Sequence, residues 1–372
     1  MKMSSISLRQ SRRQLYKKVL LSLIQLGIGN AKVVDVPEEI DWKIIEVFAA
    51  RQGLSAVLVD CVEKLPPEQK PPRKIVLKWI GTTLRSYEKK NVLYQRAIAE
   101  MAGWYNAHGF KMMVLKGFAC SLDWTNPKHR PCGDIDIWQF GQQKEADALL
   151  VKEKGIKVSN SKHHHTMFFW GNFMVENHYD FINTHRHYSH RGLEQMFKEL
   201  GQDDSHYVEV LGEKVYLPSP NLHALFLVRH ALNHFPSIGL NLRQVLDWAF
   251  FVEKHHGEID WQWLTGVLEE YHMTDFYHCL NAICVEDLGF DAAAFPKVRC
   301  TQQLRDRVLN DILFPAKKNK TPDSIFQRIP FKYRRWRDNE WKHKLCYSES
   351  MWGAFWSGVW GFILKPSSFW TD

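Results

Sequence analysis

The spacing of apolar residues changes twice along this chain of 372 residues, and this change restricts the possible folds more than any other feature. Through residues 15–26, 44–62 and 75–104, apolar residues recur at the spacing of amphipathic helices. Between about 110 and 181 they occur in short runs that are typical of strands. Beyond about 218 the helical spacing returns. The pattern predicts an α+β fold, in which a small mixed β-sheet core lies between N-terminal and C-terminal helical regions.

The same pattern suggests where the parts of the chain begin and end. The four expected parts are a helical region (1–95), an α/β core (96–217), a second helical domain (218–314) and a basic, Trp-rich segment (315–372). The last helix of the first region should end near Gly109, since glycine commonly follows a helix C-terminus. Residues 315–324 are rich in Lys and Pro, and we expect them to be mobile.

Composition restricts the function only weakly. The formal charge of +8 suits an anionic partner such as a nucleotide or a nucleic acid, but equally an ordinary solvated surface. The seven cysteines are scattered without a CxxC pair, which argues against a disulfide framework and a zinc knuckle and indicates a cytoplasmic protein. The apolar run Met351–Leu364 is too short for a membrane span, so we expect a packed helix there.

Two aspartates stand inside one of the predicted strands. In a strand, residues i and i+2 project to the same side, so Asp134 and Asp136 should point together while Ile135 and Ile137 face the core. Neighbouring carboxylates raise one another's pKa unless a cation lies between them. Mg²⁺, or Mn²⁺ in its place, would relieve this repulsion. The alternative is that both residues belong to the polar face of an edge strand.

A third carboxylate and a cationic turn could complete such a site. Residues 166–181 form a predicted hairpin around Gly171-Asn172, and its second arm carries Glu176 and His178 on one face. Lys116-Gly117 follows another apolar run. A glycine at a strand-to-helix turn lets backbone N–H groups approach a phosphate, to which the lysine adds a positive charge.

Taken together, these stretches resemble a known family. The segments "VLKG", Arg130, "GDIDIW" and "VENHYDF" resemble the nucleotidyltransferase superfamily with the polymerase-β-type core. More narrowly, the chain resembles an uncharacterised bacterial nucleotidyltransferase family. It is also similar, more distantly, to the nucleotidyltransferase toxins of abortive-infection and toxin–antitoxin systems. The resemblance extends over about residues 90–290.

The resemblance implies an activity and a role for each matching residue. It implies a Mg²⁺-dependent enzyme that moves a nucleoside monophosphate group from a nucleoside triphosphate (NTP) to a hydroxyl-bearing acceptor and releases pyrophosphate. The acceptor, a small molecule, a protein or RNA, stays open. Asp134 and Asp136 match the metal-binding pair, and Glu176 matches the third carboxylate, a metal ligand or general base. The nucleotide would be bound by Lys116, Gly117, Arg130 and Gly133. Exchanging either aspartate for asparagine should then abolish turnover and leave the fold intact.

One departure from the superfamily pattern bears on activity. Phe118 follows the loop glycine where the superfamily usually has Gly or Ser, which removes a hydroxyl and places a bulky ring near the phosphate. This motivates an alternative, a catalytically degenerate protein that binds a nucleotide or a partner. A further alternative is a toxin-like enzyme that modifies RNA or tRNA. Its motive is the run Lys332–Lys344, which interleaves basic and aromatic residues but is equally typical of an amphipathic helix over a core.

Several histidines invite a metal interpretation that their spacing does not favour. Consecutive strand residues point to alternate sides, so residues 163–165, three histidines in a row, cannot all bind one ion from one face. His230 and His234 lie one helical turn apart but lack the glutamate of a zinc-protease motif. Arg243 and Asp247 have the same spacing and could pair on a helix surface. Possible substrate contacts are His178, His230, Arg243 and Asp247.

Overall fold

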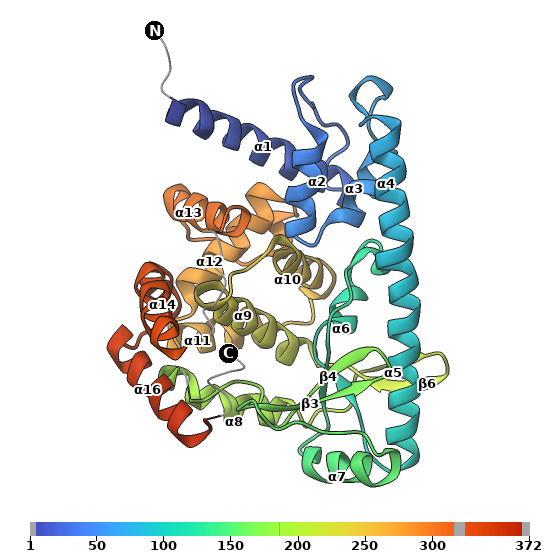
Figure 1. Ribbon diagram of the computed structural model, residues 1–372, viewed down its shortest axis with the longest axis vertical. Coiled ribbons are helices and arrows are strands. Elements are labelled where there is room, and N and C mark those ends of the chain that lie inside the picture. Colours follow the sequence, from blue (N-terminus) through green and yellow to red (C-terminus); the bar gives the residue numbers. More distant parts are fainter. Residues whose placement is uncertain (1–4, 186, 316–323, 367–372) are drawn as a thin grey trace.

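The computed structural model describes residues 5–185, 187–315 and 324–366 and places helices around a six-stranded mixed sheet (Figure 1). The expected α+β class, with helical regions on both sides of the sheet in sequence, is confirmed. The sheet lies near one end of the molecule, beside the lower half of the long helix in Figure 1. Helices from both ends of the chain occupy the rest.

The N-terminal region consists of α1 (Ser5–Ile28), α2 (Trp42–Arg51), α3 (Ser55–Val62) and a long composite helix. That helix comprises α4 (Arg73–Thr83), the π-helical turn η2 (Leu84–Glu88) and α5 (Lys89–Ala107). It begins directly after Pro71-Pro72 and ends before Gly109, whose φ of 80° stops it as predicted. The expected border between residues 95 and 96 therefore falls inside a continuous helix.

The sheet has the strand order β3-β4-β2-β1-β6-β5. The strands are β1 (Met113–Val114), β2 (Ile135–Trp138), β3 (His165–Trp170), β4 (Phe173–His178), β5 (Tyr207–Val210) and β6 (Glu213–Tyr216). β2 pairs parallel with β4 and antiparallel with β1. β2 is therefore an interior strand, and the edge-strand alternative for its aspartates is wrong.

The two faces of the sheet differ in chemistry. One face carries Ile135, Ile137 and Val175 into a core shared with α5 and α7 (Gln143–Lys154). The opposite face carries Asp136 and Trp138. Trp138 contacts Phe181 with the ring centroids 4.5 Å apart, within a core shared with the C-terminal helices. Because side chains alternate along β2, Ile135 and Ile137 enter the core under α5, whereas the Asp136 carboxylate faces the helical region.

The sheet contains two hairpins, and the sequence predicted only the first of them. β3 and β4 meet at Gly171-Asn172, with Gly171 at φ 57°, so the predicted hairpin is confirmed. The β5–β6 hairpin and α8 (Arg191–Leu200) were not predicted. The turn of that hairpin is Leu211-Gly212, and both residues have positive φ values of 51° and 88°. A leucine in the left-handed region gives no turn signal in sequence, which explains why the hairpin was missed.

The C-terminal region is helical, as the return of helical spacing beyond about residue 218 predicted. The helices are α9 (Pro220–Ser237), α10 (Leu242–His255), α11 (Trp261–Glu270), α12 (Thr274–Ala282) continued by the π-turn η5 (Ile283–Asp287), α13 (Gln302–Leu313), α14 (Ile325–Asp338), α15 (Glu340–Cys346) and α16 (Met351–Leu364). Residues 316–323, most of the stretch predicted to be mobile, lie outside the described residues.

Two expectations for the C-terminal segment have different outcomes. Lys332–Lys344 extends over α14 and α15, and α15 is amphipathic, with Trp341 against Phe235 and Lys342 paired with Asp311 at 2.6 Å. The expected packing of α16 is wrong for one of its faces, because Trp352, Trp356 and Trp360 are 57–63% exposed. No helix in the described ranges is long and apolar enough to cross a membrane.

Candidate active site

The carboxylates predicted to form a site are brought together by strand register. Asp136 of β2 and Glu176 of β4 are direct partners in the parallel pairing, so their side chains project from the same face. Asp134 immediately precedes β2 and is partly exposed. Asp136 is 1% exposed, and its Oδ1 accepts contacts from Lys116 Nζ at 2.9 Å and His178 Nε2 at 3.2 Å. Its Oδ2 is buried without a hydrogen-bond partner.

The ionisable side chains of this group differ in how their surroundings shift their pKa values. Burial opposes the ionisation of Asp136, but Lys116 and His178 outweigh it and hold the pKa of that carboxyl well below its usual range. Burial lowers the pKa of Lys116, and the nearby carboxylates more than offset this and raise it to about 12. Burial and the Asp136 charge raise the pKa of Glu176 to about 7. An ionised acid therefore lies beside one poised to bind or release a proton near neutrality.

The donor set fits a divalent cation that prefers oxygen ligands. Asp136 offers a buried oxygen atom without a partner, Glu176 is its partner in the strand pairing, and Asp134 lines the same cleft. Mg²⁺ and Mn²⁺ bind such carboxylates and complete their coordination with water and phosphate oxygens. An orphaned buried oxygen is otherwise a cost in free energy of about 1–3 kcal/mol.

The turn after β1 has the predicted strand-to-helix form. Gly117 precedes the short helix α6 (Phe118–Ser121) and adopts φ 65°. A Cβ atom on Gly117 would lie 2.7 Å from the hydroxyl of Tyr94, which donates a hydrogen bond to the Asp134 carbonyl at 2.8 Å. The ring of Phe118 is only 3% exposed and belongs to the core under α5. The expectation that this ring crowds a phosphate is therefore wrong, because the ring points away from the site.

The structure pairs the arginines differently from the sequence analysis. Arg130 and Asp247 are both buried and form a bidentate ion pair, Nε–Oδ1 at 2.7 Å and Nη2–Oδ2 at 2.8 Å. Trp124 donates a further hydrogen bond to Asp247. Asp247 is thus the partner of Arg130, and the expected surface pair with Arg243 is wrong. Within the described residues Arg243 has no ion-pair partner, and its buried Nε lacks a hydrogen bond.

A cleft joins these residues to the helical region. Its walls include the turn after β1, the segment before β2, and one side each of α9 and α10. It has a volume of about 120 Å³ and is lined by Lys116, Gly117, Cys120, Arg130, Gly133, Asp134, Asp136, Leu227, His230, Ala231, His234, Arg243, Gln244 and Asp247. Glu176 and His178 do not line the cleft themselves, but both are neighbours of Asp136, through strand pairing and through a contact to Oδ1. Every residue predicted for the site is therefore in or directly beside one cleft.

The helix α9 lines one side of the cleft with the imidazole rings of His230 and His234. The rings of His230 and His234 lie 4.2 Å apart between centroids. Burial, together with the Lys116 charge, holds the pKa of His230 well below its usual range. Neither histidine belongs to a three-residue metal-ligating group among the described residues. The neutral ring of His230 can donate or accept a hydrogen bond to a substrate.

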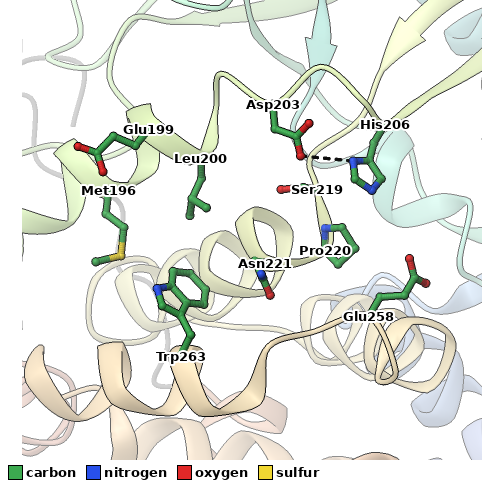
Figure 2. A pocket seen from close by; sticks show the side chains of 10 residues that line it. All are labelled: Met196, Glu199, Leu200, Asp203, His206, Ser219, Pro220, Asn221, Glu258 and Trp263. Carbon is green, nitrogen blue, oxygen red and sulfur yellow. Dashed lines mark ion pairs between the residues drawn. The ribbon is translucent and has the colours of Figure 1, made fainter.

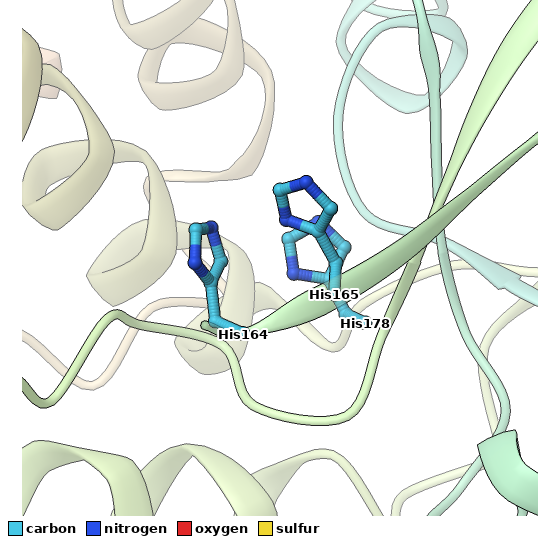
Figure 3. A group of neighbouring side chains, drawn as sticks. All are labelled: His164, His165 and His178. Carbon is cyan, nitrogen blue, oxygen red and sulfur yellow. The ribbon is translucent and has the colours of Figure 1, made fainter. Parts of the chain in front are cut away.

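Two features of this region were not anticipated from the sequence. One is the gathering of His164 and His165 with His178 in space (Figure 3). The other is a larger cavity of about 720 Å³ around the N-terminus of α9 (Figure 2). That cavity begins near Pro220, ten residues and about 15 Å along α9 from His230. No carboxylate of the β2–β4 pair lines it, so volume alone would point to a different place.

Comparisons with known proteins identify the family to which the chain belongs. A family model described as "uncharacterised nucleotidyltransferase" matches residues 38–289, which include every residue of the cleft. Among curated proteins, none matches the chain significantly. Among solved structures, an antigenic nucleotidyltransferase-like protein from Paracoccidioides brasiliensis is similar at 14% identity and a TM-score of 0.34, over 47% of this chain and 85% of that chain.

Proposed function

Because the chain belongs to the uncharacterised nucleotidyltransferase family, we propose that it transfers a nucleoside monophosphate group from an NTP to a hydroxyl group of an acceptor and releases pyrophosphate. The observation that carries the proposal is the register of β2 and β4, which sets Asp136 beside Glu176 and opposite Lys116. Buried carboxylates with an orphaned oxygen next to a lysine are suited to a cation and a phosphate chain.

In this proposal Asp134 and Asp136 hold Mg²⁺ or Mn²⁺, which when bound neutralises charge on the triphosphate, and Glu176 stays uncoordinated as the general base. Lys116 and Arg243 place two further positive charges at the cleft. Arg243 is the better phosphate ligand of the two cleft arginines because the charge of Arg130 is already balanced by Asp247. The enclosed volume of about 120 Å³ is smaller than the roughly 300 Å³ from which small-molecule pockets usually begin. The base and sugar would therefore extend towards solvent.

The proposed reaction makes one bond and breaks one. The acceptor oxygen attacks the α-phosphorus, the bond between that phosphorus and the bridging oxygen breaks, and pyrophosphate leaves. Glu176 takes the hydroxyl proton, for which a pKa of about 7 is well matched. The histidines on α9 would lie near the acceptor or the leaving group.

The first test is calorimetric titration with ATP, GTP, CTP and UTP, with and without Mg²⁺. We expect Mg²⁺-dependent binding of at least one NTP by the natural protein and none by the Asp134→Asn variant. Asp134→Asn is the cleaner change, since Asp136 is buried against Lys116 and its exchange would also disturb packing. The expectation that Asp136→Asn leaves the fold untouched is therefore not retained.

The matched control is Asp204→Asn, which removes an exposed carboxylate paired with Lys111. It should bind NTP as the natural protein does. Turnover is then measured as pyrophosphate release with pools of sugars, proteins and RNA as acceptors. Equal NTP binding by the natural protein and Asp134→Asn would contradict the assignment.

Of the two alternatives, the degenerate binding protein loses the steric part of its motive, because the Phe118 ring is buried away from the cleft, and keeps only the missing hydroxyl. The RNA-modifying alternative keeps part of its basis. Arg334 and Arg337 of α14 are exposed, whereas Lys342 and Lys344 of α15 are paired with Asp311 and Glu340. RNA in the acceptor pool tests it directly.

A further inference from the structure

Three histidines from a loop and two strands gather next to the carboxylate face (Figure 3). His164 immediately precedes β3, His165 begins β3, and His178 ends β4. Antiparallel pairing makes His165 and His178 direct partners, so their rings share the face that also carries Glu176. One ring nitrogen of each of the three lies within 4.8 Å of the others. The arrangement depends on the β3–β4 hairpin, so the three consecutive histidines at 163–165 did not reveal it in the sequence.

His165 is the member of the group whose two ring nitrogens are both buried and unsatisfied in the described part of the chain. Its side chain is only 3% exposed, and within the described residues neither ring nitrogen has a hydrogen-bond partner. The nearest acid is Glu176, whose Oε1 is 3.4 Å from Nε2 without hydrogen-bond geometry. Both ring nitrogens are therefore open to a ligand that would satisfy them.

His178 is already oriented as a metal ligand would be. Its Nδ1 lies 3.1 Å from the Asp180 carbonyl, which can only accept, so Nδ1 carries the proton. Its Nε2 faces the carboxylates, 3.2 Å from Asp136 Oδ1, and metal binding would replace that contact. Histidines that bind metals almost always donate their other N–H to a carbonyl or carboxylate in this manner.

We propose that His164, His165 and His178 form a binding site for a divalent transition metal ion of the Zn²⁺ type, directly beside the Mg²⁺ position at the carboxylates, which His178 also adjoins. Three imidazole nitrogens are a recurrent protein donor set for Zn²⁺, which keeps a fourth position for water or substrate. Mg²⁺ requires oxygen ligands and would not compete well for this site. Asp136 and Glu176, at 3.2 and 3.4 Å from cluster nitrogens, offset the positive charge of the ion. The inference does not depend on nucleotidyl transfer.

The test uses the full-length protein, freed of metal with a chelator that is then removed. Zn²⁺ is titrated in competition with a chromogenic chelator in the presence of excess Mg²⁺, and Co²⁺ binding is followed by its visible absorption. We expect stoichiometric Zn²⁺ binding that Mg²⁺ does not displace, and Co²⁺ bands typical of nitrogen ligands in a low-coordinate site. His165→Ala should weaken Zn²⁺ binding by at least about tenfold.

Two more variants keep the test decisive. His164→Ala removes a partly exposed ring from a loop, so it reports on the site even if His165→Ala fails to fold. His163→Ala is the matched control, because it removes the neighbouring histidine that is outside the group, and it should bind Zn²⁺ like the natural protein. Asp134→Asn should lose Mg²⁺-dependent NTP binding and keep Zn²⁺ binding, which separates this inference from the proposed function. Unchanged Zn²⁺ affinity in His164→Ala, or an equal loss in His163→Ala, would overturn the inference.

Discussion

At residue scale, Gly117 combines a backbone requirement with a steric one. Its φ of 65° and ψ of −96° are unfavourable for any residue with a side chain, and an added Cβ would lie 2.7 Å from the Tyr94 hydroxyl. We expect Gly117→Ala to lower the free energy of unfolding by about 2–3 kcal/mol, from backbone strain and the displaced hydroxyl together. Urea denaturation followed by tryptophan fluorescence measures the change.

Gly133 provides the control for that substitution. It lines the same cleft, but a Cβ there would meet no atom within 4 Å, and its φ is not in the left-handed region. Gly133→Ala should therefore change the stability by no more than about 0.5 kcal/mol. Similar stabilities for the two alanine variants would show that the backbone conformation at position 117 does not require glycine.

Individual side chains also mark the limit of prediction from sequence. Asp136 and Glu176 could be placed on one face from strand alternation alone, because that period is local and the pairing of two strands is a small extrapolation. The Arg130–Asp247 pair could not, because 117 positions separate the two residues and only the packing of α10 against the core brings them together. The spacing of Arg243 and Asp247 favoured a local pair that the tertiary contact replaces.

At the scale of elements, α10 carries one arginine and one aspartate with opposite roles. Asp247 balances the buried Arg130, so Asp247→Asn should lower the free energy of unfolding by about 3–5 kcal/mol. Arg243 has no ion-pair partner in the described chain, so Arg243→Gln should leave stability unchanged or slightly higher. The same variant should weaken NTP binding about tenfold, through the loss of one charge-assisted contact.

Calorimetry with the preferred NTP and urea denaturation distinguish the two roles. If Arg243→Gln destabilised the protein as much as Asp247→Asn, Arg243 would be structural, and its assignment as a phosphate ligand would fail. Arg243→Lys is a useful third variant, since it keeps the charge and loses the planar, bidentate geometry of the guanidinium.

The segment after β4 is tied to α8 by an acid that titrates near neutrality. Glu194 accepts the backbone N–H groups of Phe181 and Ile182 at 3.0 and 2.9 Å. Burial, with the negative charge of Asp180, raises the pKa of Glu194 from 4.5 to about 7. The unfolded chain therefore releases this proton at a lower pH than the folded protein does. Stability contributed by Glu194 is present below about pH 4.5 and is lost as the pH rises to about 7.

This pH dependence can be isolated by difference. The free energy of unfolding of the natural protein minus that of Glu194→Gln should fall between about pH 4.5 and 7 and be flat above. Glu199→Gln, an exposed position on the same helix, should follow the natural protein. A flat difference curve for Glu194→Gln would show that folding does not raise the pKa of this carboxyl.

Elements differ in how well their sequence identifies them. The β3–β4 hairpin has a glycine at its positive-φ turn and the helices α9 to α12 have apolar residues at helical spacing, so all were predicted. α8 has the same spacing, in Leu193, Met196, Phe197 and Leu200, and could have been predicted from it. β5 and β6 have weaker local signals and are stabilised by contacts such as that of α5 with β6. The histidine group has no local signal, because strand pairing alone makes neighbours of His165 and His178.

At the scale of the whole molecule, the helical regions at the two ends of the sequence share one hydrophobic core. That core contains buried residues of α1 and α3 together with residues of α9, α10 and α13. The side chain of Gln25 donates to the carbonyl of Asp287, and Lys17 pairs with Asp306. The first and third of the four expected parts are thus one packing unit, and the sheet joins it through the face that carries Trp138.

Gln52 is the clearest link in this unit, and it supplies the test. It is 2% exposed, its amide nitrogen donates to the Ile312 carbonyl at 3.0 Å, and its amide oxygen accepts the Leu242 N–H at 2.8 Å. Gln52→Ala would leave two buried backbone groups without partners, at a cost of about 2–4 kcal/mol in the free energy of unfolding. Gln14→Ala, at an exposed position of α1, should cost almost nothing. If the ends form one unit, the urea transition of Gln52→Ala moves to lower concentration as a whole, with far-UV circular dichroism and tryptophan fluorescence still coincident. An early partial transition, with the remaining signal unfolding where the natural protein does, would instead show that the N-terminal helices fold and unfold independently of the domain that carries Arg243 and Asp247.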